Sequence, residues 1–108
     1  MPRQIEEYVT SDGRSPFSEW LDGLSDRKAR ARVRVRLDRL SLGNFGDCRS
    51  LGGGLHELRI DYGPGYRVYF GEIGDRIVLL LTGGTKRSQQ RDIDRATEFW
   101  ADFRRRES

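Results

Sequence analysis

Apolar residues recur with two different spacings along the chain, and the change of spacing divides it into helical and extended parts. An imperfect alternation of apolar and polar residues over residues 3–9 predicts a first strand. Apolar residues then recur every three or four positions over residues 16–24 and 26–42, which predicts two amphipathic helices. Their short link favours an antiparallel helical hairpin, with Ser25 as the N-cap of the second helix and Gly43 as its left-handed end.

The second half of the chain shows the period of two that is typical of strands. Residues 57–61 and 66–70 alternate polar with apolar side chains. Residues 77–82 are almost entirely apolar, as a central strand buried on both faces would be. Glycine-rich turns at residues 62–65 and 71–75 connect these strands as an antiparallel meander.

A third helix is predicted over residues 88–105, where apolar residues again follow helical spacing. The chain is therefore expected to form one α+β domain over residues 1–108. This domain has an N-terminal strand, a two-helix hairpin, a three- to four-stranded mainly antiparallel sheet and a C-terminal helix. We expect the hairpin to cover one face of the sheet and the opposite face to be available for chemistry.

Composition narrows the class of protein. The chain is 35% hydrophobic and includes eleven aromatic residues, enough to seed a core. No run approaches the roughly 18 apolar residues of a membrane span, and the first residues lack the apolar core of a secretion signal, which favours a soluble cytoplasmic protein. Cys48 has no second cysteine for a disulfide, and His56 is the single histidine. The usual zinc ligands are therefore missing, and no metal or other cofactor is expected.

Charge is distributed unevenly along the chain. Twenty basic residues, 18 of them arginine, stand against 17 acidic residues, which gives a net charge of +3. Residues 26–39 alone contain seven basic and two acidic residues, a local charge of +5, so the remainder sums to −2. This basic stretch falls on the second predicted helix, on the faces that its apolar stripe leaves free.

Further basic residues lie on the predicted sheet. Strand parity places four polar side chains on one face, those of Glu57, Arg59, Arg67 and Tyr69. Arg59 and Arg67 become neighbours if their strands pair through the first turn. Two adjacent arginines are stable when an anion lies between them. That anion is either a phosphate, whose oxygens match the guanidinium donors, or a carboxylate of the chain itself, Glu57 or Asp61.

The segment that follows the buried strand adds two more cations. Residues 82–90 leave that strand and enter the last helix, and they include Lys86 and Arg87. Backbone N–H groups at a helix N-terminus, together with nearby cations, favour the binding of an anion. The segment is not a Walker A loop, because the GxxxxGK[ST] spacing is absent.

These segments carry a resemblance to a known family. Leu58-Arg59-Ile60, GPGYRVYF at residues 63–70 and LLLTGGTKRSQQRDI at residues 79–93 resemble the RelE/ParE toxin superfamily, most of all its HigB-like branch of phage-derived addiction module killer proteins. The similarity covers essentially the whole chain. It implies a RelE-like fold and the toxin of a type II toxin–antitoxin system. Many relatives are mRNA interferases that cut mRNA in the ribosomal A site without a metal, whereas the ParE branch inhibits DNA gyrase.

The resemblance implies roles for the basic residues. The arginine of the GYR element corresponds to Arg67, and the basic pair at the end of the third meander strand corresponds to Lys86 and Arg87. The upstream basic positions correspond to Glu57 and Arg59, so one of them is acidic here. Arg67 and Arg59 are expected to stabilise the charge on the scissile phosphate, with Lys86 and Arg87 supporting them.

The residue that transfers the proton is left open. A tyrosine that follows the basic pair in some relatives corresponds to a position near Ile93 and is absent. HigB-like relatives often use a histidine or an acidic residue instead, which makes His56, Glu57 and Asp92 candidates. Arginine does not deprotonate near neutral pH, so Glu57 or His56 is the expected base for the ribose 2′-OH. Parity points His56 toward the Leu58 face, unless a bulge in the preceding glycines reverses it.

The resemblance also implies partners. These are a cognate antitoxin, often a small helix-turn-helix protein, and the ribosome with its mRNA. Arg30, Arg34 and Arg36 of the basic helix are expected to dock on ribosomal RNA, and Tyr69 is expected to stack on a base. Three alternatives stay open: a ParE-like toxin that binds gyrase without catalysis, an inactive prophage-derived interaction module, and a basic helix that is merely solvated or faces the antitoxin.

Overall fold

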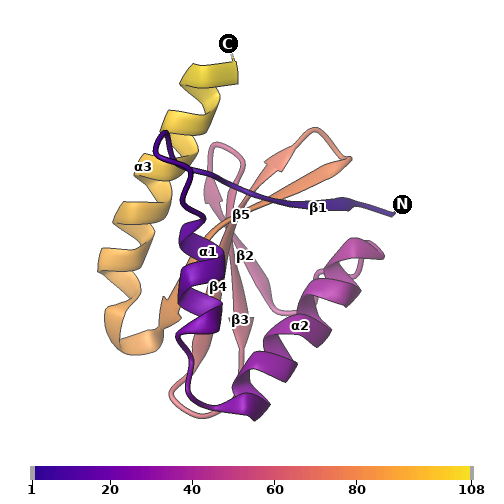
Figure 1. The fold of residues 1–108 in the computed structure, drawn as a ribbon. Helices are drawn as coiled ribbons and strands as arrows, with labels where there is room; N and C mark the ends of the chain where they lie inside the picture. Colours follow the sequence, from indigo (N-terminus) through magenta and orange to yellow (C-terminus); the bar gives the residue numbers. More distant parts are fainter. Residues whose placement is uncertain (1, 108) are drawn as a thin grey trace.

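The computed structural model describes residues 2–107 as a five-stranded sheet between two layers of helix (Figure 1). Within these residues no helix is both long and apolar enough to span a bilayer. The elements in chain order are β1 (Gln4–Glu7), α1 (Pro16–Asp22), α2 (Arg27–Ser41), β2 (Cys48–Gly52), β3 (Leu55–Ile60), β4 (Tyr66–Ile73), β5 (Ile77–Thr85), the 3-10 turn η1 (Lys86–Ser88) and α3 (Gln89–Glu107). The α+β class and the C-terminal helix are confirmed.

The sheet has the strand order β1-β5-β4-β3-β2. Strands β2 to β5 form an antiparallel meander, and β1 pairs with β5 in parallel. The sheet thus exceeds the predicted three to four strands. Both edge strands lack clean alternation, because β1 is exposed at three of its four residues and β2 at three of its five. Strands that bury so little apolar surface leave a weak periodic signal.

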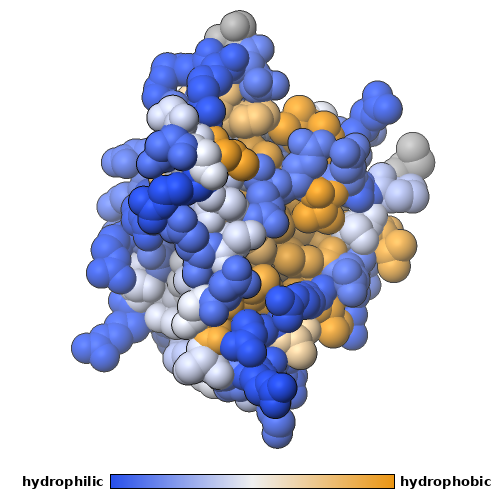
Figure 2. All heavy atoms as spheres, viewed as in Figure 1, coloured by the Kyte–Doolittle hydropathy of each residue, from blue (hydrophilic) through white to orange (hydrophobic). Residues whose placement is uncertain are grey.

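Helices α1 and α2 cover one face of the sheet. Figure 1 shows them diverging from the loop that joins them, and Figure 2 shows apolar side chains at the surface between them. Because the apolar stripe of each helix must be buried, both helices turn it toward the sheet. The resulting core joins Phe17, Leu21, Ala29, Val33 and Leu40 of the helices to Leu58, Val68, Phe70, Val78 and Leu80 of the strands.

The ends of α2 follow from local hydrogen bonding. The helix is capped by Asp26 and not by Ser25, because the Asp26 carboxylate accepts hydrogen bonds from the backbone N–H groups of Lys28 at 2.9 Å and Ala29 at 3.3 Å. A carboxylate also interacts favourably with the positive end of the helix dipole. At the other end Gly43 has a φ of 88°, the left-handed conformation that the sequence predicted.

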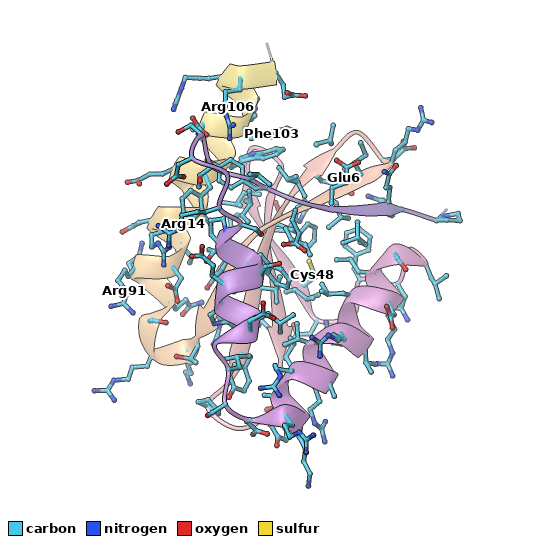
Figure 3. The ribbon with its side chains drawn as sticks, in the orientation of Figure 1. Glu6, Arg14, Cys48, Arg91, Phe103 and Arg106 are labelled. Atoms are coloured by element: carbon cyan, nitrogen blue, oxygen red, sulfur yellow. The ribbon has the colours of Figure 1, made fainter. Side chains whose placement is uncertain are left out.

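Helix α3 covers the opposite face of the sheet, so the prediction of an open face is wrong. Ala96 and Trp100 pack against Tyr69, Leu79 and Leu81. The apolar stripe of α3 requires a partner, and the first face is already occupied by α1 and α2. The outer side of α3 is polar, and Figure 3 shows Arg91 there, pointing away from the sheet.

Gly83 and Gly84 lie inside β5, which continues to Thr85 and so extends beyond residue 82, where the predicted strand ends. A Cβ atom on Gly83 would lie 2.3 Å from the ring of Trp20, and one on Gly84 would lie 1.8 Å from a carboxylate oxygen of Asp92. Both distances are far below van der Waals contact. The glycine pair is therefore needed so that Trp20 and Asp92 can approach the strand from its two faces.

Candidate functional site

The pairing of β2, β3 and β4 gathers polar side chains on the α3 face. Arg59 pairs directly with Arg67, as strand parity predicted, and Glu57 pairs with Tyr69. From the other side, Arg49 of β2 pairs with Glu57. Paired residues on one face place their side chains next to each other, so three arginines surround one carboxylate. We call Arg49, Arg59 and Arg67 around Glu57 the arginine cluster.

Glu57 is the centre of the cluster, and its side chain is completely buried. Its Oε1 lies 3.2 Å from Arg49 Nη2 and 3.3 Å from Arg59 Nε. Its Oε2 accepts hydrogen bonds from the hydroxyl of Tyr69 at 3.0 Å and the side-chain amide of Gln89 at 2.8 Å. Both oxygens are engaged, so Glu57 is the internal carboxylate that holds the arginines together.

These contacts keep Glu57 ionised. Burial alone would raise the pKa of the Glu57 carboxyl, but hydrogen bonds from Gln89 and Tyr69 and the charge of Arg49 outweigh burial, and the pKa is lowered. The pKa of Tyr69 is raised, first by burial and then by the negative charge of Glu57. The phenol therefore stays protonated at neutral pH and continues to donate its hydrogen bond.

Arg67 is nearly buried and faces Glu57. Its side chain is 11% exposed, and its Nε lies 3.6 Å from Glu57 Oε2. This Nε is one of two buried side-chain nitrogens in residues 2–107 that lack a hydrogen-bond partner. Arg67 Nη1 donates to the carbonyl of Gly65 at 3.2 Å, and the backbone N–H of Lys86 donates to the same carbonyl at 2.8 Å. The shared carbonyl places η1 beside Arg67.

The cluster is accessible at its outer edge. The side chains of Arg59 and Arg49 are 39% and 46% exposed, and Lys86 and Arg87 are exposed on η1. Three guanidinium groups on one carboxylate leave an excess of positive charge, to which Lys86 adds. Guanidinium groups present paired donors, so the arrangement favours an anion with several oxygens, such as a phosphate.

Neither predicted base is available to accept a proton from a molecule bound at the cluster. Glu57 has no free oxygen, so it positions the arginines and has no lone pair exposed to a ribose hydroxyl. His56 lies on the opposite face, as parity predicted, stacked on Phe70 with Nε2 3.1 Å from Glu72. The register shift near the glycines falls in β2 and leaves the alternation of β3 intact. The structure therefore does not bring His56 to the arginines.

Tyr69 and Asp92 are also inaccessible. The prediction that Tyr69 is free to stack on a base is corrected, because α3 covers this face and the Tyr69 side chain is fully buried. Asp92 is buried as well, and it accepts a hydrogen bond from the hydroxyl of Ser88.

Within residues 2–107, no group of three or more histidine, cysteine, aspartate or glutamate side chains is arranged to hold a metal ion.

The basic residues of α2 are not equivalent. Arg30 donates to the backbone carbonyl of Leu24, and Arg36 donates to the backbone carbonyls of Phe45, Asp47 and Arg59. These two side chains, which the sequence assigned to RNA docking, therefore hold α2 in place. Arg34, the third of that set, is exposed.

Cys48 is a packing residue. It is half-buried against the core between the sheet and helices α1 and α2, and its side chain is labelled in Figure 3. Burial raises the pKa of the Cys48 thiol to about 11. The thiol is therefore protonated at neutral pH, and the side chain behaves as a small apolar group.

Two members of the site, Arg49 and Gln89, were missed by the sequence analysis. Arg49 lies in β2, whose burial pattern is irregular and whose register shifts, so its face could not be assigned from periodicity. Gln89 begins α3 and reaches Glu57 only through the tertiary fold. The signal in the sequence was Glu57, two residues before Arg59 on the same face, because a carboxylate there indicates that further donors surround it.

Comparison with known proteins finds an uncharacterized protein of Haemophilus influenzae that is 46% identical to this chain over 80 residues. The matched region covers 74% of this chain and 81% of that protein. No family model matches the chain. The similarity therefore extends over most of both proteins.

Proposed function

This chain belongs to the same family as the Haemophilus influenzae protein, and we propose that it is the toxin of a type II toxin–antitoxin pair. In this proposal it has a RelE-like fold and acts in the cytoplasm as a ribosome-dependent mRNA interferase. Its partners are a cognate antitoxin, such as a small helix-turn-helix protein, and the ribosome with its mRNA. The resemblance of residues 58–93 to the RelE/ParE superfamily supports the proposal.

The observation that carries the proposal is the arginine cluster. Arg67 is held by Glu57 at 3.6 Å, and its strand neighbour Arg59 presents a side chain that is 39% exposed. Guanidinium groups present paired donors that match phosphate oxygens, so two neighbouring arginines favour a phosphate at the accessible edge of the cluster. Because Glu57 fixes the guanidinium groups in advance, little reorganisation is needed when a phosphate binds.

The chemistry that this site supports is metal-free transesterification. The ribose 2′-oxygen attacks the adjacent phosphorus and the bond to the 5′-oxygen breaks, which leaves a 2′,3′-cyclic phosphate and a 5′-hydroxyl. Arg67 and Arg59 stabilise the negative charge that gathers on the phosphate oxygens, and Lys86 and Arg87 hold the flanking backbone. Since Glu57 and His56 offer no free base here, the 2′-OH proton passes to water and a water proton reaches the 5′-oxygen.

Cleavage of mRNA by purified protein tests this proposal. The wild-type chain is expected to cut mRNA when translating ribosomes are present and to leave naked mRNA intact. Arg67→Ala abolishes cleavage and Arg67→Lys reduces it, because lysine keeps the charge but lacks the paired donors. Arg76→Ala, which removes an exposed arginine between β4 and β5, retains full activity. Normal cleavage by folded Arg67→Ala would contradict the assignment.

A second candidate function is ParE-like inhibition of DNA gyrase without catalysis. One observation favours it: both predicted bases are sequestered, Glu57 inside the cluster and His56 on the other face. A binding toxin needs no proton transfer. Inhibition of gyrase supercoiling, with translation and mRNA unaffected by the same preparation, would favour this candidate over the nuclease.

A further inference from the structure

The basic side chains of α2 have no carboxylate partners. Within residues 2–107, none of the seven lysine and arginine side chains of this helix lies within ion-pair distance of a carboxylate. The three arginines of the cluster, in contrast, all contact Glu57. Uncompensated cations on one helix produce a positive potential that attracts an acidic partner.

Part of this basic surface lines a groove between α2 and the end of β3. The groove has a volume of about 520 Å³. Lys28, Arg32 and Arg39 line it from the helix and are spaced by four and seven residues, which places them on one helical face. Ile60 and Asp61 line it from the opposite side. The lining is therefore basic along its length, with a single acidic residue.

The groove also offers apolar surface between the cations. Val35 lies on the same helical face and is 47% exposed, one of three strongly exposed large apolar residues in the described chain. Ala31, which is also exposed, adds apolar surface one turn earlier on the helix. None of the side chains that line the groove is aromatic, and the ring of the neighbouring Tyr62 is covered by Arg32, whose guanidinium carbon lies 4.5 Å from the ring centroid. The groove therefore offers no free ring on which an RNA base could stack. This composition favours a protein segment over RNA.

The two walls of the groove are fixed in advance. Arg36 donates to the carbonyl of Arg59 and to two carbonyls in the loop before β2, which ties the helix to β3. Strand β2 pairs only with Leu55–Leu58, so the end of β3 lies beyond the edge strand. A preformed groove binds without a large ordering cost.

We propose that this groove binds an acidic amphipathic segment of a partner protein. Carboxylates of the segment contact Lys28, Arg32 and Arg39, and its apolar side chains pack on Val35 and Ala31. The groove shares no residue with the arginine cluster, so this inference goes beyond the proposed nuclease activity and does not depend on it.

Binding of a synthetic peptide tests the inference. The probe is a fluorescent helical peptide with leucine at every third or fourth position and glutamate elsewhere, and a scrambled peptide of the same composition is its control. The wild-type chain is expected to bind the amphipathic peptide more tightly than the scrambled one. Arg32→Glu combined with Arg39→Glu weakens this binding by roughly tenfold or more. Val35→Ser, a mild change at an exposed position, weakens it by a smaller factor.

A matched double variant on the same helix separates the groove from general charge. Arg27→Glu combined with Arg34→Glu reverses two exposed cations with the same seven-residue spacing outside the groove, and it should bind the amphipathic peptide nearly as well as wild type. The inference is overturned if the two double variants lose peptide affinity equally, or if the peptide and its scrambled form bind alike. It is also overturned if a single-stranded RNA outcompetes the peptide and depends on both pairs of arginines.

Discussion

The arginine cluster and helix α2 both gather basic side chains, but they hold them differently. In the cluster three guanidinium groups share one fully buried carboxylate, and Tyr69 and Gln89 complete its hydrogen bonds. On α2 seven basic residues have no carboxylate partner within residues 2–107. The cluster therefore has fixed geometry and a small excess charge, whereas α2 has high charge and mostly exposed side chains.

This difference shows that charge density along the sequence does not locate the guanidinium groups that are held in fixed positions. The most basic stretch, residues 26–39, forms a largely exposed surface whose electrostatic attraction acts at long range and is weakened by salt. The site suited to hold one phosphate in one orientation contains an acidic residue at its centre. Preorganised donors, more than net charge, are what stabilise a transition state.

The largest expected effect is the loss of the central carboxylate. Glu57→Gln leaves three arginines without their counterion, and removal of one partner from a buried ion pair typically costs about 3–5 kcal/mol of unfolding free energy. Glu19→Gln is the matched control, because Glu19 pairs with Arg14 at 2.7 Å on the exposed surface, where such a pair contributes little to stability. Urea unfolding of both variants measures the contrast. Equal losses would show that Glu57 does not organise the cluster.

The unfolding free energy at low pH should depend on the same carboxylate. The pKa of Glu57 is lowered in the folded chain, so its contribution to stability is fully present above the unfolded pKa of roughly 4.3 and is lost as pH falls through the folded value. Unfolding free energy is therefore expected to decline below about pH 5 in the wild type and to decline less steeply in Glu57→Gln. Parallel pH profiles for the two proteins would contradict this.

A smaller difference in unfolding free energy is expected between variants of two arginines of α2. Arg36→Ala removes the donors of three backbone carbonyls and should cost roughly 2 kcal/mol of unfolding free energy. Arg34→Ala removes an exposed side chain and should change stability by no more than about 0.5 kcal/mol. Thermal or urea unfolding distinguishes them. A loss from Arg34→Ala that matched Arg36→Ala would refute the division of α2 into fold-holding and free arginines.

Periodicity predicted the parts of this molecule that depend on local sequence. Strand parity placed Arg59 beside Arg67 and turned His56 to the other face, because side chains alternate strictly in a regular strand. The apolar stripes of α1 and α2 predicted the core between these helices and the sheet, because residues three or four positions apart share one face of a helix. The link between these features and an activity came from the resemblance alone and stays a proposal.

The errors have a common physical cause, since each depends on which distant segments meet. Helix α3 covers the face that parity left open, and this buries Tyr69 and Glu57. Arg49 joins the cluster only through the shifted register of β2. No local pattern encodes these contacts, because they follow from the packing of the whole sheet.

Growth arrest in bacterial cells tests the central claim most directly, that the arginine cluster is the working site of a toxin. The measurement compares induced expression of the wild-type chain, of Arg59→Ala combined with Arg67→Ala, and of Arg27→Ala combined with Arg34→Ala on α2. All three proteins are first verified as soluble and folded by circular dichroism. We predict that the wild type and the α2 variant arrest growth and that the cluster variant does not. Undiminished arrest by the folded cluster variant would contradict the account.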